Sequence, residues 1–319
     1  MEIIMEELIF SLNATIPIFL MMILGYILKQ IRMMDEPFIK TLNKFNYNVT
    51  LPVLVFRDLS QSDFLQVWDT KYVLFCFLVT LFCILSVWGL AGLFLRNREI
   101  VGEFVQASYR SSAAVLGIAF IQNIYGNSGM APLMIIGTVP LYNVAAVLIL
   151  SFTGPEAKGL NKTALKKSVL GILTNPIILG ILAGILASLC RLDLPVILDK
   201  TVGNIAALAS PLALIGLGAG FEGRKAVKLV KPTLLTTFVK LTVWPLLFLP
   251  LAILMGFRNE MLIALLVMLG APTTPSCYIM ARNMGHDGVL TSGAVVATTF
   301  FSSVTLTVAL FILKSLGYV

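Results

Sequence analysis

The sequence is poor in charge. Charged residues make up 12% of its 319 residues, about half the share found in soluble domains. Hydrophobic residues make up 58%, and the mean hydropathy is +0.94. These values exclude a soluble enzyme and a disordered chain. The formal net charge of +7 would suggest a nucleic-acid partner only if the bases gathered on one folded surface.

Cysteine and histidine are also scarce. The cysteines Cys76, Cys83, Cys190 and Cys277 lie in or beside apolar segments, and His286 is the only histidine. No metal-ligand spacing is present, so we expect neither a zinc site nor any other metal or cofactor. We expect His286 on the surface, at the cytoplasmic end of a membrane helix.

Long apolar runs dominate the rest of the chain. A helix that crosses the hydrocarbon core needs about 20 apolar residues, and continuous runs without alternation favour helices over a β-barrel. We therefore predict an all-α integral membrane protein with ten transmembrane helices, at about 8–28, 38–58, 72–95, 103–125, 130–152, 169–190, 197–220, 231–255, 260–284 and 288–315.

The placement of the bases predicts the orientation. Lysine and arginine gather after the first, third, fifth and seventh helices, at Lys29, Arg32, Lys40 and Lys44, at Arg96 and Arg98, at Lys158, Lys162, Lys166 and Lys167, and at Arg224, Lys225, Lys228 and Lys231. By the positive-inside rule these loops are cytoplasmic. We expect a multi-pass protein of the cell membrane with both termini outside the cytoplasm, whose partner is the lipid bilayer and not nucleic acid.

An internal repeat is visible when the sequence is shifted along itself by half its length. One constant offset, without gaps, aligns Pro17 with Pro176, Gly25 with Gly184, Arg32 with Arg191 and Pro52 with Pro211. We predict a first five-helix repeat over 1–153, a cytoplasmic linker over 154–168 and a second repeat over 169–319. Because five is odd, the second repeat is inverted. Inverted repeats are typical of transporters that bind substrate near the membrane midplane.

The ninth predicted helix carries the clearest signs of a break. Pro272 and Pro275 flank Thr273 and Thr274, and proline inside a helix removes a donor and clashes with the preceding turn. We expect one half-helix to end near Ala271 and the next to begin near Thr274 as N-cap. The free N–H groups at the second start would attract an anion.

The equivalent part of the fourth helix, 110–117, has no proline. Its Ser111 and Ser112, with Gly117, permit an unwound turn, and symmetry with the ninth helix favours one. If both helices break and cross, Ser111 and Ser112 meet a group of residues from the ninth helix, which are Pro272, Thr273, Thr274, Pro275 and Ser276.

The charges expected within the membrane are few. No Asp or Glu lies in the middle of a predicted span, which argues against antiport built on midplane carboxylates. We expect Arg110 to attract an anion or to hold a local carbonyl. Lys240 either snorkels to the cytoplasmic interface or, if desolvated, titrates. Tyr142, Asn143 and Asn48 are further candidates for substrate binding, although packing explains them equally well.

These motifs resemble the auxin efflux carrier family, and within it the bacterial malate and malonate carriers. The resemblance rests on Ala271 through Arg282 followed by Gly285 and Asp287, and on Pro17 through Tyr26, Asn46 through Pro52, Asn175-Pro176 and Tyr142-Asn143-Val144. It implies two inverted five-helix repeats with broken, crossing helices 4 and 9. It also implies a scaffold of helices 1, 2, 6 and 7, often dimeric, and a transport part of helices 3–5 and 8–10 that moves like an elevator.

One departure from the plant carriers bears on the substrate. Those carriers have an asparagine and a proline at the crossover of helix 4, where this chain has Ser112 and no proline. We therefore predict a secondary transporter, not an enzyme, for a small mono- or dicarboxylate that resembles malate or malonate more than auxin. Alternatives are a sodium-coupled organic-anion symporter of the bile-acid type and, less favoured, a membrane sensor or channel.

Overall fold

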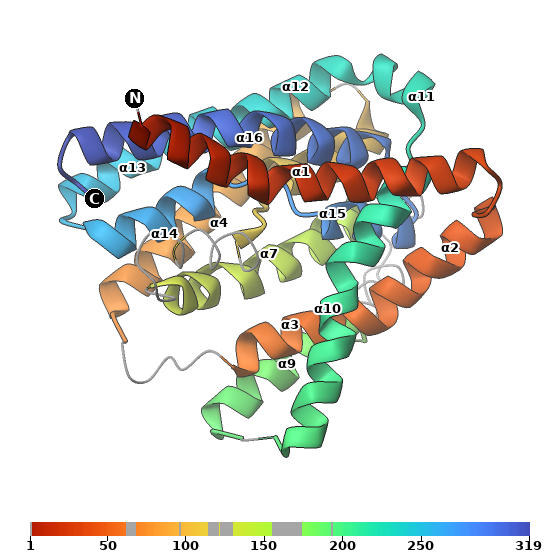
Figure 1. Cartoon of the computed structure of the whole chain (residues 1–319), viewed down its shortest axis with the longest axis horizontal. Helices are drawn as coiled ribbons and strands as arrows, with labels where there is room; N and C mark the ends of the chain where they lie inside the picture. The colour runs from red at the N-terminus through yellow and green to blue at the C-terminus, as the bar shows by residue number, and fades with distance from the viewer. Residues whose placement is uncertain are drawn as a thin grey trace.

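The computed structural model describes residues 2–61, 68–95, 97–113, 121, 130–154, 174–192 and 194–319, with side chains from residue 16 onward. Throughout these ranges the regular structure is helical, and no strand occurs in them (Figure 1). The predicted linker 154–168, apart from Gly154, and the second half of the predicted fourth span lie outside the described residues.

The helices follow the predicted spans closely. In chain order they are α1 (Glu2–Gln30), α2 (Glu36–Phe45), the π-turn η1 (Asn46–Thr50), α3 (Leu51–Ser60), α4 (Thr70–Phe94), η2 (Arg98–Ile100), α5 (Val101–Tyr109), α7 (Ala131–Thr153), α9 (Pro176–Leu189), α10 (Val196–Ala219), α11 (Gly223–Lys228), α12 (Val230–Phe238), the π-turn η4 (Val239–Val243), α13 (Trp244–Leu254), α14 (Asn259–Gly270), α15 (Ser276–Asn283) and α16 (Val289–Ser315).

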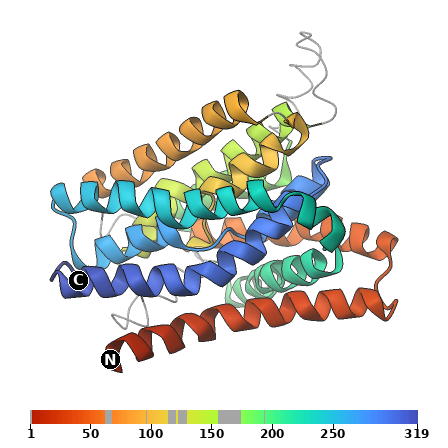
Figure 2. The same ribbon diagram turned by 90° about the horizontal axis from the view of Figure 1, so that it is seen from above.

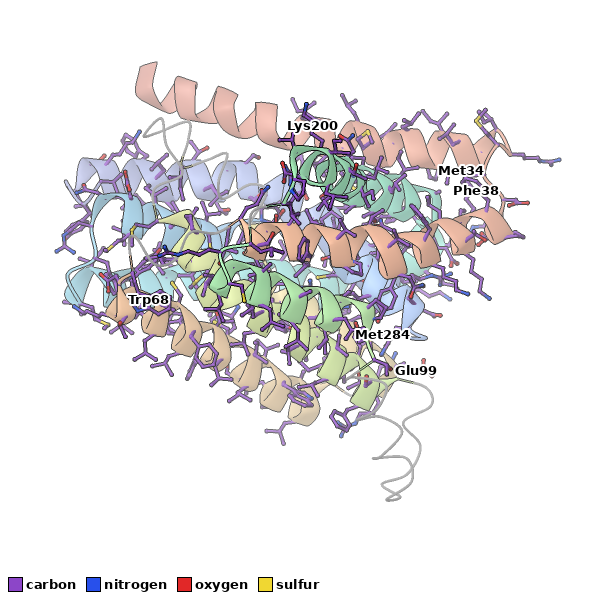
Figure 3. All side chains as sticks on the ribbon, turned by 90° about the horizontal axis from the view of Figure 1, so that it is seen from below. Met34, Phe38, Trp68, Glu99, Lys200 and Met284 are labelled. Atoms are coloured by element: carbon purple, nitrogen blue, oxygen red, sulfur yellow. The ribbon has the colours of Figure 1, made fainter. Side chains whose placement is uncertain are left out.

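Five of the described helical segments are long and apolar enough to cross a bilayer. They are Thr70–Phe94, Ala131–Thr153, Val196–Ala219, Val230–Leu254 and Val289–Ser315. Their surfaces carry large exposed apolar side chains such as Leu93, Leu246 and Phe300. Outside these segments, Phe38 of α2 and Trp68, just before α4, are also exposed; both are labelled in Figure 3. Apolar surface of this extent is stable only against lipid or another protein. The chain is therefore an integral membrane protein, as its composition predicts.

Local sequence explains where several helices begin. The Asp69 carboxylate accepts from Tyr72 N at 2.9 Å and caps α4. Asn175 caps α9 in the same way, at 2.9 Å from Ile177 N, and Pro176 occupies the first helical turn. Capping side chains satisfy N–H groups that have no partner inside the helix. Asn175 and Pro176 thus form a cap-plus-proline helix start.

Element boundaries recur at the offset of the sequence repeat. The segment Glu36–Ser60 corresponds to Val196–Ala219, and Thr70–Phe94 corresponds to Val230–Leu254, each to within one position. The turns that end α1 and α9 also match, because Arg32 and Arg191 both adopt positive φ, at 61° and 48°. These two arginines are aligned by the repeat, so equivalent sequence positions adopt equivalent backbone.

Two glycines produce matching helix contacts in the two halves. α1 packs against α10 and α3 packs against α9 (Figure 1). A Cβ at Gly25 would lie 2.1 Å from the Ile215 carbonyl oxygen, and a Cβ at Gly184 would lie 2.8 Å from the Phe56 carbonyl oxygen. Small residues let helix backbones approach closely in membranes. The repeat aligns Gly25 with Gly184 and Phe56 with Ile215, so the two contacts are equivalent.

The layers place the two interrupted segments inside the molecule. Figure 2 shows α1 along one face and α4 along the opposite face, with α16 and α12–α13 between them. The end of α5, the C-terminal half of α14 and the start of α15 lie between these outer helices and are almost wholly buried. Polar groups at these helix ends therefore face protein and not lipid.

Candidate functional site

A cavity lies beside two interruptions of the helical path, one after α5 and one between α14 and α15. It has a volume of about 70 Å³, several times the roughly 10–15 Å³ that one water molecule requires. The structure brings most of the predicted site residues into its wall, namely Arg110, Ser111, Ser112, Tyr142, Asn143, Thr274, Pro275 and Ser276. Residues of α3, α9 and α10 form the opposite wall.

The two breaks are joined by a backbone hydrogen bond. α5 ends at Tyr109, and Arg110 adopts an extended backbone. α14 ends at Gly270 and α15 begins at Ser276. Across this gap Ser112 N donates to the Pro272 carbonyl at 3.0 Å. One freed N–H of the first segment thus pairs with one freed carbonyl of the second, as a membrane interior favours.

The predicted helix start in the second segment is displaced. Pro275, not Thr274, is the N-cap of α15, and no side chain caps the helix. Thr274 Oγ1 instead lies 3.2 Å from Ser276 Oγ. The cap is absent because Pro275, at the N-cap position, has no side-chain acceptor. Both hydroxyls lie at the cavity wall, beside an uncapped helix start.

Arg110 is buried at the cavity wall, with 3% of its surface exposed. Nη2 donates to Asn143 Oδ1 at 2.8 Å and to Ser276 Oγ at 3.0 Å, and Nη1 contacts Met280 Sδ at 2.7 Å. A thioether is a weak acceptor, and Nε has no partner within the described part of the chain. Arg110 therefore neither snorkels nor holds a local carbonyl. It retains donor capacity beside the cavity.

Ser111 links the cavity to a charge behind it. Its hydroxyl donates to the Met268 carbonyl at 2.7 Å and accepts from Lys240 Nζ at 2.5 Å. Because its single proton is used by Met268, Ser111 has no proton left for a ligand. Thr274 and Ser276 are better placed to donate.

Lys240 does not snorkel, which corrects one of its two predicted behaviours. Its side chain is fully buried, and Nζ also donates to the Leu269 carbonyl at 2.7 Å. The π-turn η4 in the middle of the Val230–Leu254 segment aims this side chain inward, toward the C-terminal end of α14. The snorkelling interpretation is wrong because partners from another helix outweigh escape to the interface.

Three of the predicted substrate-binding residues do not line the cavity, and neither does Lys240. Asn48 is exposed, and its Nδ2 bonds back to the Lys44 carbonyl at 2.8 Å. Thr273 is 1% exposed, and its Oγ1 donates to the Ala107 carbonyl at 2.8 Å. Pro272 contributes the carbonyl that accepts from Ser112. Thr273 and Pro272 hold the two breaks together, whereas Asn48 faces away from them.

Sequence reasoning missed the carboxylate in the cavity wall. Asp58, from the last turns of α3, lines the cavity together with Arg110 and Ser276. Ser210 of α10 is the other polar residue on that side. By its position in the sequence, Asp58 falls at the outer edge of the second predicted span. The signal was present, since Arg57 and Asp58 interrupt an otherwise apolar run over 51–59.

Two further buried groups lie near the start of α16. Glu103 accepts from Gly288 N at 2.8 Å and from Thr291 N at 3.0 Å, so α5 supplies the cap for α16. His286 is 5% exposed, with Nε2 3.1 Å from the Leu150 carbonyl. The predicted surface position of His286 is therefore wrong. Gly288 has positive φ and no side chain that could cap α16, so Glu103 of α5 supplies the acceptor.

Apolar helices thus surround a cavity that is lined by a buried arginine and several hydroxyl groups. Sequence comparison names the class: residues 10–310 match the family described as membrane transport protein. The chain belongs to this family and is a membrane transporter, which confirms the family that its motifs indicated.

Relatives with assigned names are similar over most of their length. An "Uncharacterized transporter" of Methanothermobacter thermautotrophicus is 22% identical over 310 residues, 93% of this chain and 96% of that protein. A "Putative malonate transporter" of Rhizobium meliloti is 24% identical over 318 residues, 94% of this chain and 95% of that protein. The "Uncharacterized transporter YfdV" of Escherichia coli K12 is 22% identical, covering 83% and 85%.

Proposed function

We propose that this protein is a secondary transporter for a small organic anion, a mono- or dicarboxylate. The observation that carries the proposal is the Arg110 guanidinium at the cavity wall. It makes no ion pair with any of the described residues. A buried guanidinium without a paired charge is costly, and a carboxylate ligand would supply that charge through short, bidentate hydrogen bonds.

The surrounding groups favour a compact carboxylate. Ser112, Thr274 and Ser276 place hydroxyls on the same side as Arg110. Arg110 and these hydroxyls can bind the oxygens of one small carboxylate group. The Rhizobium meliloti relative, which is named for malonate, supports the same choice. A plain dicarboxylate is therefore the first substrate to test.

The composition of the walls supports an elevator mechanism. Nearly all polar groups lie on the side formed by α5, α7 and α15, which are parts of the predicted transport helices. The opposite wall, from predicted scaffold helices, is largely apolar apart from Asp58 and Ser210 and includes Leu51, Leu54, Val55, Ile177, Ala209 and Ala213. A substrate held by one wall can move with it past a smooth surface.

The remaining architecture is part of the proposal. We place ten membrane helices in two inverted repeats, over 1–153 and 169–319, with broken helices crossing at the cavity and both termini outside the cytoplasm. The matching contacts of Gly25 and Gly184 support the repeat. Residues 154–168 would then be a cytoplasmic linker. The scaffold helices α1, α2–α3, α9 and α10 would form a homodimer interface.

A sodium-coupled symporter remains the second candidate, and a sensor or channel a third. Sodium dependence separates the first two, and saturable flux with a steep temperature dependence separates a carrier from a channel. A transporter of the proposed kind moves its anion equally well in sodium and in choline buffers. Uptake that fails without sodium would support the symporter.

The test of the proposed site is ligand-induced stabilisation of the purified protein. A ligand at 100 times its Kd stabilises the folded state by about 2.7 kcal/mol. We expect malonate or another small carboxylate to raise the Tm of the wild type but not that of the double variant Thr274→Ala, Ser276→Ala. Thr201, exposed and bonded to its own helix, provides a matched control. An unchanged ligand response in a folded double variant would disprove this site.

A further inference from the structure

The Lys240 ammonium occupies a site made of oxygen atoms. Nζ donates to Ser111 Oγ at 2.5 Å and to the carbonyls of Leu269 and Met268 at 2.7 and 3.4 Å. An ammonium has three donors, and these three oxygens use all of them. The side chain is fully buried, and Nζ makes no ion pair with a carboxylate among the described residues.

The carbonyl partners of Lys240 both lie at the negative end of a helix dipole. Met268 and Leu269 lie in the last turn of α14, which ends at Gly270. The last carbonyls of a helix have no partner inside the helix, and the helix dipole makes this end negative. A buried cluster of such oxygens requires a cation or a set of donors. In this chain the cation is covalently attached to the π-turn of the neighbouring segment.

The same oxygens lie directly behind the proposed anion site. Ser111 bonds to Lys240 on one side and lines the cavity on the other. A positive charge at this position stabilises an anion in the cavity through space, since buried charges are screened little. Carbonyl and hydroxyl oxygens are also the ligands that a monovalent cation such as Na⁺ takes.

We propose that Lys240 is a tethered cation that takes the position a coupling ion would otherwise need. The inference deepens the proposed function and rests on it for the anion. It states that the wild type binds and moves its anion without sodium. It also states that removing the ammonium leaves a vacant oxygen site that accepts a free monovalent cation. Lys240 is thus a positioning residue that holds Ser111 and the end of α14 in place.

The test uses the purified full-length protein at constant ionic strength and chloride. Sodium, methylammonium and the bulky cation N-methylglucamine are compared by Tm. We expect the Tm of the wild type to be the same in all three. Lys240→Ala should lower the Tm by about 5 °C or more in N-methylglucamine, as loss of several buried hydrogen bonds would, and sodium or methylammonium should restore at least half of that loss.

Two further variants separate a vacant site from general damage. Lys240→Met fills the volume and leaves no room for a cation, so its Tm should fall without recovery in either salt. Lys71 donates to the Met255 carbonyl at 2.6 Å but is exposed, so Lys71→Ala should respond to no cation. A Lys240→Ala variant that is insensitive to both cations would overturn the proposal.

If Lys240→Ala does not fold, measurements on the wild type alone still test the proposal. Anion binding and Tm that are equal in sodium and N-methylglucamine support the tethered cation, and a sodium requirement in either measurement overturns it. Cation rescue is measured without substrate. If rescue occurs but no carboxylate binds the wild type, the proposed function fails and the Lys240 site stands.

Discussion

Arg110 and Ser276 lie in two distant segments of the chain and meet at 3.0 Å, with Arg110 Nη2 donating to Ser276 Oγ. Arg110 follows the end of α5, and Ser276 is the first residue of α15. The contact joins a guanidinium to the start of a helix, where N–H groups are free and the dipole is positive. A carboxylate that enters here replaces a neutral hydroxyl partner with an ionic one.

The first prediction concerns the planar guanidinium group of Arg110. Arg110→Lys keeps the charge but loses the planar fork that holds Asn143 and Ser276 together. We expect the affinity for the carboxylate to fall about tenfold or more, which is about 1.4 kcal/mol. Ligand titration followed by Tm measures it. Arg98, which bonds to the Gly92 carbonyl at an exposed site, serves as control, and Arg98→Lys should bind as the wild type does.

The second prediction is that a substitution at Asp58 strengthens anion binding. Its carboxylate lines the same cavity as Arg110 and opposes an anionic ligand. We expect Asp58→Asn to tighten anion binding about tenfold or more, since removing a like charge from the same small cavity is worth more than about 1.4 kcal/mol at an effective dielectric constant near 20. Asp199→Asn, at an exposed site bonded to Gln61, should change nothing. Weaker binding by Asp58→Asn would show that the carboxylate acts on the ligand in another way.

The third prediction is that substitutions at the two candidate asparagines, Asn143 and Asn48, differ in their effect on the Kd. Asn143 accepts from Arg110 at the cavity, whereas Asn48 bonds back to its own helix at the surface. Asn143→Ala removes an acceptor that positions the guanidinium, so the Kd should rise about tenfold. Asn48→Ala should leave the Kd within about twofold of the wild type. A large effect at Asn48 would place the binding site elsewhere.

A fourth prediction tests the packing between the two halves. Gly25→Ala places a Cβ at 2.1 Å from the Ile215 carbonyl oxygen, so α1 must move away from α10. Overpacking of this kind costs about 1–3 kcal/mol, and we expect a clear fall in Tm. Gly89→Ala is the matched control, because nothing lies within 4 Å of its added Cβ. Equal Tm values for the two variants would contradict the close contact.

Sequence predicts the helical elements because the signals for them are local. Apolar length marks each helix, Pro272 and Pro275 mark the interruption between α14 and α15, and Asn175-Pro176 marks the start of α9. Each depends on backbone chemistry within a few residues. The proposed repeat rests on prolines and glycines at one constant offset, and Arg32 and Arg191, which share that offset, both adopt positive φ.

The site is harder to predict because it depends on contacts between distant segments. The motifs place Ser111, Ser276 and Arg110 together, and these residues do line one cavity. The burial of Lys240 is not visible in the sequence, since its partners are carbonyls on α14 as well as a side chain from a distant segment. Asn48 and Thr273 look equally suitable in sequence. Only the directions of their side chains separate them from the cavity.

The most direct test of the central claim is uptake of radiolabelled malonate by proteoliposomes under an imposed, inside-positive membrane potential. An anion gains about 2.3 kcal/mol per charge per 100 mV. We predict saturable, potential-dependent accumulation in the wild type, the same in sodium and choline buffers, and almost none with Arg110→Ala. Uptake by the wild type no faster than by protein-free liposomes, for malonate, malate and acetate alike, would contradict the account.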